Sequence, residues 1–142
     1  MPSFTTQIPN LQQSGPICQV TITPSFETAN LLRQQGLPIP SSIISALIDT
    51  GASVTGISSK VVQSLELVPR GRTNIATPSS GSHPANVYDI ALKFGETVTI
   101  GLIRAVEVNL IAQNIDCLIG RDVLHHGVLI YIGYTNLFTL SF

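Results

Sequence analysis

Charged residues are scarce in this chain of 142 residues. Lys, Arg, Asp and Glu together make up 11% of the sequence, compared with roughly 25% in an average soluble domain. The seven basic residues are scattered and the formal net charge is −1, so the chain has no basic stripe for nucleic acid and no polybasic membrane anchor. A small domain with so few charged side chains leaves part of its apolar surface exposed to water. This favours a covering partner, most simply a second copy of the chain.

Long apolar runs and cysteines are also few. The longest uninterrupted apolar run, Val128–Ile132, is too short to span a bilayer. The first residues have neither the charged nor the apolar region of a secretory signal. Cys18 and Cys117 cannot supply a disulfide framework or a zinc site, and their apolar neighbours favour buried free thiols. These absences predict a cytoplasmic protein with neither a nucleic-acid nor a membrane partner.

The pattern of the chain predicts one domain that is mainly β. Many short segments have strand composition, only two or three short helices are indicated, and strands do not alternate regularly with helices. We expect a small closed or sandwiched barrel spanning residues 17–142. Residues 1–16 are polar and interrupted by prolines, and they predict a tail or a loosely held first strand.

Several elements can be placed from local signals. Strands are predicted at 17–24 and 42–49, and helices after Ser25 and after Ser58 or Ser59, because serine is a good helix N-cap. Residues 73–94 form two β-like arms around a Pro- and Ser-rich centre, which predicts a long hairpin. Two more strands are expected within 95–111, and a closing hairpin is expected at the C-terminus.

The stretch "ALIDTGAS" places a lone carboxylate, Asp49, at the end of an apolar strand and directly before Thr50-Gly51. An aspartate at a strand end can be a turn former or a displayed reactive group. Taken alone, the stretch does not decide between these two interpretations. The remaining aspartates do not share the pattern, because none of them is followed by Thr-Gly.

Two motifs together resemble the retropepsin family, which comprises single-domain aspartic proteases of retroviruses and their cellular and bacterial relatives. The first motif is "LIDTGA" at 47–52 and the second is "LIGR" at 118–121. Their order and separation suit the family, and the predicted hairpin between them falls where the family carries its flap. Viral members often have an acidic residue where this chain has Ser53, so cellular and bacterial relatives are the better match.

The resemblance implies a small closed barrel of acid-protease type and the activity of an aspartic endopeptidase. Aspartic proteases are the known example of two carboxylates that share one proton, one acting as base on a water and the other as acid. Because this chain has a single Asp-Thr-Gly, the second carboxylate must come from a second copy. The expected partners are therefore a homodimer and a peptide or protein substrate, with no cofactor.

The resemblance also assigns roles to further residues. Thr50, Gly51 and Ala52 would support the catalytic loop, with Gly51 allowing close approach of substrate backbone. Leu118, Ile119 and Gly120 would pack beneath this loop, and Arg121 would brace the dimer. The flap tip would consist of Pro78, Ser79, Ser80, Gly81 and Ser82. The C-terminal "LFTLSF" would be an apolar edge strand that contributes to dimer formation.

Alternative interpretations remain open from the sequence. The chain could be a catalytically silent protease-like module that dimerises or binds peptides, or a purely structural β domain. Arg121 could be an ordinary solvent-facing residue at a helix start. His125 and His126 lie close to Asp122, but adjacent helical residues point about 100° apart, and no metal site is predicted.

Overall fold

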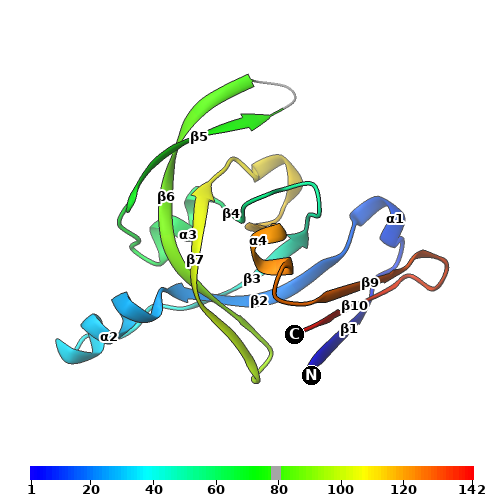
Figure 1. The fold of residues 1–142 in the computed structure, drawn as a ribbon, viewed down its shortest axis with the longest axis horizontal. Helices are drawn as coiled ribbons and strands as arrows, with labels where there is room; N and C mark the ends of the chain where they lie inside the picture. The colour runs from blue at the N-terminus through cyan, green and yellow to red at the C-terminus, as the bar shows by residue number, and fades with distance from the viewer. Residues whose placement is uncertain (78–80) are drawn as a thin grey trace.

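The computed structural model describes residues 1–77 and 81–142, and Figure 1 shows their fold. The strands are β1 (Ser3–Gln7), β2 (Ile17–Pro24), β3 (Ser42–Ile48), β4 (Gly56–Ile57), β5 (Gly71–Thr77), β6 (Gly81–Phe94), β7 (Val98–Glu107), β8 (Cys117–Ile119), β9 (Val128–Ile132) and β10 (Leu137–Ser141). The helices are α1 (Leu11–Ser14), α2 (Phe26–Gln34), α3 (Ser59–Ser64) and α4 (Arg121–Leu124), with 3-10 turns η1 (Ile111–Gln113) and η2 (Gly133–Thr135). The predicted mainly β domain with a few short helices is confirmed.

The larger sheet of the described residues closes on itself. Its strand order is β2-β3-β8-β4-β7-β6-β5, and β2 pairs in addition with β6. This last pairing joins β2, β3, β8, β4, β7 and β6 into a ring, while β5 stays outside it as the second arm of the β5–β6 hairpin. Fully buried side chains such as Ile22, Ile57, Ile90 and Ile119 fill the interior. The closed sheet therefore supplies a rigid body from which the hairpin extends (Figure 1).

One strand prediction is wrong. Residues 95–111 hold a single long strand, β7, followed by the 3-10 turn η1, where two strands were expected. Gly101 lies within this strand, and its missing Cβ leaves room for the ring of Phe26: a Cβ there would lie 2.5 Å from a ring carbon. The two helices predicted to begin after a serine cap are both present. Ser25 Oγ accepts a hydrogen bond from the Thr28 N–H, and Ser58 Oγ accepts one from the Val61 N–H.

The second sheet joins the two ends of the chain. Its order is β1-β10-β9, so the N- and C-termini lie close together (Figure 1). β1 is antiparallel to β10, and paired hydroxyls connect Ser3 with Ser141 and Thr5 with Thr139 at 2.7 and 2.8 Å. The expectation that "LFTLSF" forms an edge strand is wrong, because β10 is paired on both sides within its own chain. The edges of this sheet are β1 and β9.

Long apolar helices are missing from the described residues. None of their helices is long and apolar enough to cross a membrane.

Candidate active site

The strand pairing brings the two sequence motifs together. β3 and β8 are parallel, with Leu47 opposite Leu118 and Ile48 opposite Ile119. The next residue, Asp49, donates its N–H to the Ile119 carbonyl at 2.9 Å. On its other side β8 pairs with β4, the strand that follows the Asp49 loop. The loop therefore begins and ends on the two strands that flank β8.

The Asp49 carboxylate is fixed by its own loop. Its Oδ1 accepts a hydrogen bond from the Gly51 N–H at 2.9 Å, and its carbonyl accepts one from the Ala52 N–H at 3.2 Å. This is the turn that aspartate favours at a strand end. Asp49 is half-buried, while Thr50 and Gly51 are exposed. Because Gly51 N–H is the only hydrogen-bond donor to this carboxylate among the described residues, Oδ2 is available to an outside group.

Arg121 holds the same loop from the start of α4. Its guanidinium donates to the Thr50 carbonyl at 2.7 Å, and its N–H donates to the Ala52 carbonyl at 2.9 Å. The side chain is exposed, yet it is bonded to the loop and does not simply face solvent. The predicted role of Arg121 as a brace between subunits stays a prediction. Its hydrogen bonds to Thr50 and Ala52 lie within one chain.

Gly120 lies against the far end of the Asp49 loop. A Cβ at this position would lie 2.6 Å from the main-chain carbon and oxygen of Val54. Its φ of −88° is one that any residue can adopt, so the requirement for glycine here is one of space. Leu118 is half-buried and Ile119 fully buried. The second motif thus lies directly under the loop that carries Asp49.

Sequence reasoning missed two residues of this arrangement, Thr55 and Asp122. The Asp122 carboxylate accepts hydrogen bonds from the Thr55 N–H and hydroxyl, and Thr55 Oγ1 accepts one from the Gly120 N–H at 3.2 Å. Thr55 is fully buried. The sequence signals available were a threonine in an uncharged stretch and an aspartate in the first turn of a helix. Neither signal identifies the other residue as its hydrogen-bond partner.

The predicted flap corresponds to the hairpin of β5 and β6. The arms are in register from Gly71 opposite Val87 to Thr77 opposite Gly81. Of the predicted tip, Gly81 and Ser82 are exposed and begin β6, and Gly81 has a φ of +69° that suits glycine. Pro78, Ser79 and Ser80 lie outside the described residues.

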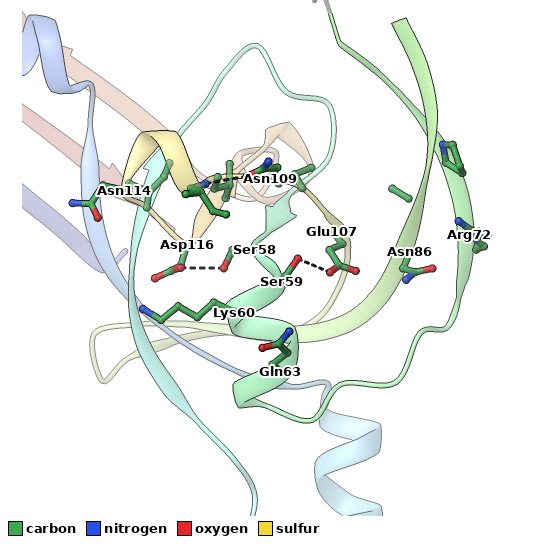
Figure 2. Close-up of a pocket in the computed structure, with 16 residues that line it drawn as sticks. Ser58, Ser59, Lys60, Gln63, Arg72, Asn86, Glu107, Asn109, Asn114 and Asp116 are labelled. Carbon is green, nitrogen blue, oxygen red and sulfur yellow. Dashed lines mark hydrogen bonds between the residues drawn. The ribbon is translucent and has the colours of Figure 1, made fainter. Parts of the chain in front are cut away.

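A large cavity lies beside the base of this hairpin, and no residue from 49–52 lines it. Its volume is about 690 Å³. Ser59 and Tyr88 donate their hydroxyls to the two oxygens of Glu107 at 2.8 and 3.0 Å. Burial raises the pKa of Tyr88, and the neighbouring Glu107 carboxylate raises it further. Figure 2 shows the bond from Ser59 to Glu107 and a second one from Ser58 to Asp116.

Metal ligands do not gather in the described residues. They contain no group of three or more His, Cys, Asp or Glu side chains placed to hold a metal ion. The His125 and His126 rings contact each other edge to face, with centroids 5.8 Å apart.

The fold matches that of a known class of enzymes. It is similar to the crystal structure of a retropepsin-like aspartic protease from Rickettsia conorii, with a TM-score of 0.53 over 89% of this chain and 93% of that one. The two sequences are 13% identical, so this likeness concerns the fold. No curated protein matches the chain in sequence.

The sequence itself defines the family. Residues 39–126, more than half of the chain, match the family of gag-polyprotein putative aspartyl proteases. The chain belongs to this family, and its fold is retropepsin-like, as the sequence predicted. The matched segment includes both Asp49 and the Gly120-Arg121 junction.

Proposed function

We propose that the protein is an aspartic endopeptidase whose active form is a homodimer with two Asp49 carboxylates at its centre. The observation that carries the proposal is the position of Asp49. It stands at the end of β3, it is held by Gly51 N–H through one oxygen, and it is supported from below by Gly120 and Arg121. Membership of an aspartyl protease family supports the same chemistry.

The reaction needs a second carboxylate close to the first. With two Asp49 side chains sharing one proton, the ionised one removes a proton from a water, and that water attacks the scissile carbonyl carbon. The protonated one donates to the carbonyl oxygen, and a proton is then delivered to the leaving nitrogen. The chain has one Asp-Thr-Gly, so only a partner subunit can provide the second group in equivalent surroundings.

The sheet β1-β10-β9 offers a surface for the second copy. The outward face alternates with the core face and carries no charged residue. Its accessible members are Ser3, Thr5, Gln7, Val128, Ile130, Ile132, Leu137 and Thr139. Val128 and Ile130 are about half exposed. An uncharged, partly apolar face can meet its own copy across a two-fold axis without burying an unpaired charge.

This sheet is also connected to the Asp49 loop. α4, whose first residue Arg121 bonds to Thr50 and Ala52, is followed within a few residues by β9. Association through the sheet would therefore fix the position of α4 and of the loop that it holds. We propose in addition that the β5–β6 hairpin closes over an extended peptide and excludes water from the carboxylates.

The test compares Asp49→Asn with the wild-type protein on a mixed peptide library, with cleavage read by mass spectrometry. We expect the substitution to abolish hydrolysis, because an amide can neither accept the proton of the water nor share one with its counterpart. Glu27→Gln, an equally small change at an exposed carboxylate in α2, is the control and should keep full activity. Wild-type turnover by Asp49→Asn would refute the assignment. If neither protein cleaved any peptide, the silent-module alternative would replace it.

A further inference from the structure

The cavity beside the flap base is built from three parts of the chain that lie far apart in sequence. One wall consists of Arg72 in β5 and residues 84–86 in β6, and another consists of residues 58–60 and Gln63 at α3. The third runs from Glu107 at the end of β7 through η1 to Asp116. The catalytic loop is not part of it, so the cavity is a feature separate from the carboxylate proposed for catalysis.

The acidic groups of the cavity are already engaged. Both oxygens of Glu107 accept hydroxyl hydrogen bonds, from Ser59 and from the buried Tyr88. Asp116 accepts a hydrogen bond from the Ser58 hydroxyl at 3.0 Å, and its main-chain carbonyl accepts the Ser58 N–H. Three of the four carboxylate oxygens, both of Glu107 and Oδ1 of Asp116, therefore already accept a hydroxyl hydrogen bond from the protein. A cationic ligand would have to compete with them.

The basic groups of the cavity are not engaged. Within the described part of the chain, neither the Lys60 ammonium nor the Arg72 guanidinium forms a hydrogen bond or an ion pair, although both side chains line the cavity. This differs from Arg70 and Lys93, which are paired with Asp89 and Glu96. The unused capacity of the cavity is therefore that of hydrogen-bond donors with positive charge, and the complementary ligand is an acceptor with negative charge.

We infer that this cavity binds an acidic segment of the polypeptide substrate, with carboxylates of that segment meeting Lys60 and Arg72. The inference rests on the proposed peptidase function and names a substrate class for it. Figure 2 shows Lys60 on the α3 side and Arg72 on the β5 side of the cavity. A chain with several carboxylates can reach both sides, and the volume of about 690 Å³ lies in the range of sites that hold ligands much larger than a single inorganic ion.

The position of the cavity gives binding there a consequence for the flap. Arg72 belongs to an arm of the hairpin, whereas Lys60 belongs to the body. An acidic segment held by both residues connects the hairpin to the body while the scissile bond lies elsewhere on the substrate. Binding energy gained in the cavity then contributes to substrate affinity without any contact to the reacting atoms, so we expect the cavity to affect KM more than kcat.

The experiment measures peptide binding to the Asp49→Asn protein by fluorescence anisotropy. One labelled peptide carries several Glu residues, and a matched peptide carries Gln at the same positions. We expect the Glu peptide to bind more tightly, and each of Lys60→Met and Arg72→Met to weaken its binding by about three- to fivefold without changing that of the Gln peptide. The double charge reversal, Lys60→Glu with Arg72→Glu, should transfer the preference to a Lys-containing peptide. Arg33→Met, which removes a cation from α2 outside the cavity, is the control and should change nothing.

Three results of the binding experiment would overturn the inference. They are equal binding of the Glu and Gln peptides, an equal loss of affinity with Arg33→Met, and displacement of the Glu peptide by inorganic phosphate at matched ionic strength. The last result would indicate a site for small anions. Because the binding experiment uses the Asp49→Asn protein, all three results are independent of hydrolysis. A wild-type enzyme that cleaves Glu and Gln peptides with the same KM would refute the acidic-substrate inference while leaving the peptidase assignment intact.

Discussion

Asp122 accepts two hydrogen bonds from Thr55, one from the main-chain N–H at 3.0 Å and one from the hydroxyl at 2.8 Å. The same hydroxyl accepts the N–H of Gly120. These contacts join the end of the Asp49 loop to the first turn of α4, while Arg121 holds the beginning of that loop. The position of Asp49 therefore depends on a residue far from it in sequence that does not belong to either recognised motif.

Replacement of Thr55 by valine should destabilise the protein. Valine keeps the shape of threonine but leaves the buried Gly120 N–H without an acceptor and removes one donor to Asp122, so we expect a loss of about 1–3 kcal/mol in the free energy of unfolding. Thr55→Ser keeps the hydroxyl and removes one methyl group, which should cost only about 1 kcal/mol. Urea titrations of the two variants provide the comparison. A serine variant less stable than the valine variant would show that packing, and not the hydroxyl, matters here.

Replacement of Gly120 by alanine should also destabilise the fold. The new Cβ would meet the main chain of Val54 at 2.6 Å, and backbone cannot rotate away as a side chain can, so we expect a cost of about 1–3 kcal/mol. Gly71→Ala is the matched control, because a Cβ there meets no atom within 4 Å and its effect should stay within about 0.5 kcal/mol. Thermal unfolding of both variants measures the difference. Equal melting temperatures would contradict the steric argument.

Local signals in the sequence were sufficient for much of this structure. The caps Ser25 and Ser58 mark the starts of α2 and α3, and the predicted apolar strand is present and ends at Ile48, one residue before the expected Asp49. Each of these features depends on residues a few positions apart. The two motifs could be connected only through their resemblance to a family, since nothing in either one indicates a parallel pairing of β3 with β8.

Most of the features that were missed or misjudged are long-range. The pairing of β1 with β10 joins opposite ends of the chain through Ser and Thr side chains, which carry no signal that identifies a partner. It makes β10 a central strand, whereas an apolar C-terminal segment on its own suggests an edge. The cavity likewise combines residues from α3, β5, β6 and η1, so only the folded chain shows that Lys60 and Arg72 line one space.

A charge on the outward face of the β1-β10-β9 sheet should weaken the proposed homodimer. Ile130 in β9 is 49% exposed in the single chain, and in a dimer formed through this face Ile130→Glu would bury an unpaired carboxylate. We expect the variant to sediment as a monomer at concentrations where the wild type is a dimer, with a matching loss of specific activity. Leu102→Glu, at a similarly exposed apolar position in β7, should retain both. An Ile130→Glu protein that stays dimeric and active would exclude this face as the interface.

The thiol of Cys18 should be resistant to alkylation until the solution is strongly alkaline. Burial raises its pKa from the ordinary 9.0 to about 11, because the thiolate would have to form in partly apolar surroundings. The pKa of Cys18 is higher in the folded than in the unfolded chain. The contribution of this thiol to the free energy of unfolding is therefore complete below pH 9.0 and is lost as the pH rises through about 11. The measurement is the rate of iodoacetamide labelling against pH in Cys117→Ala, which isolates Cys18, with circular dichroism recorded at each pH to confirm the fold. The half-maximal rate should lie near pH 11 for the folded protein and near 9 in urea. A midpoint near 9 in the folded protein would show that the strand β2 opens to solvent at this position.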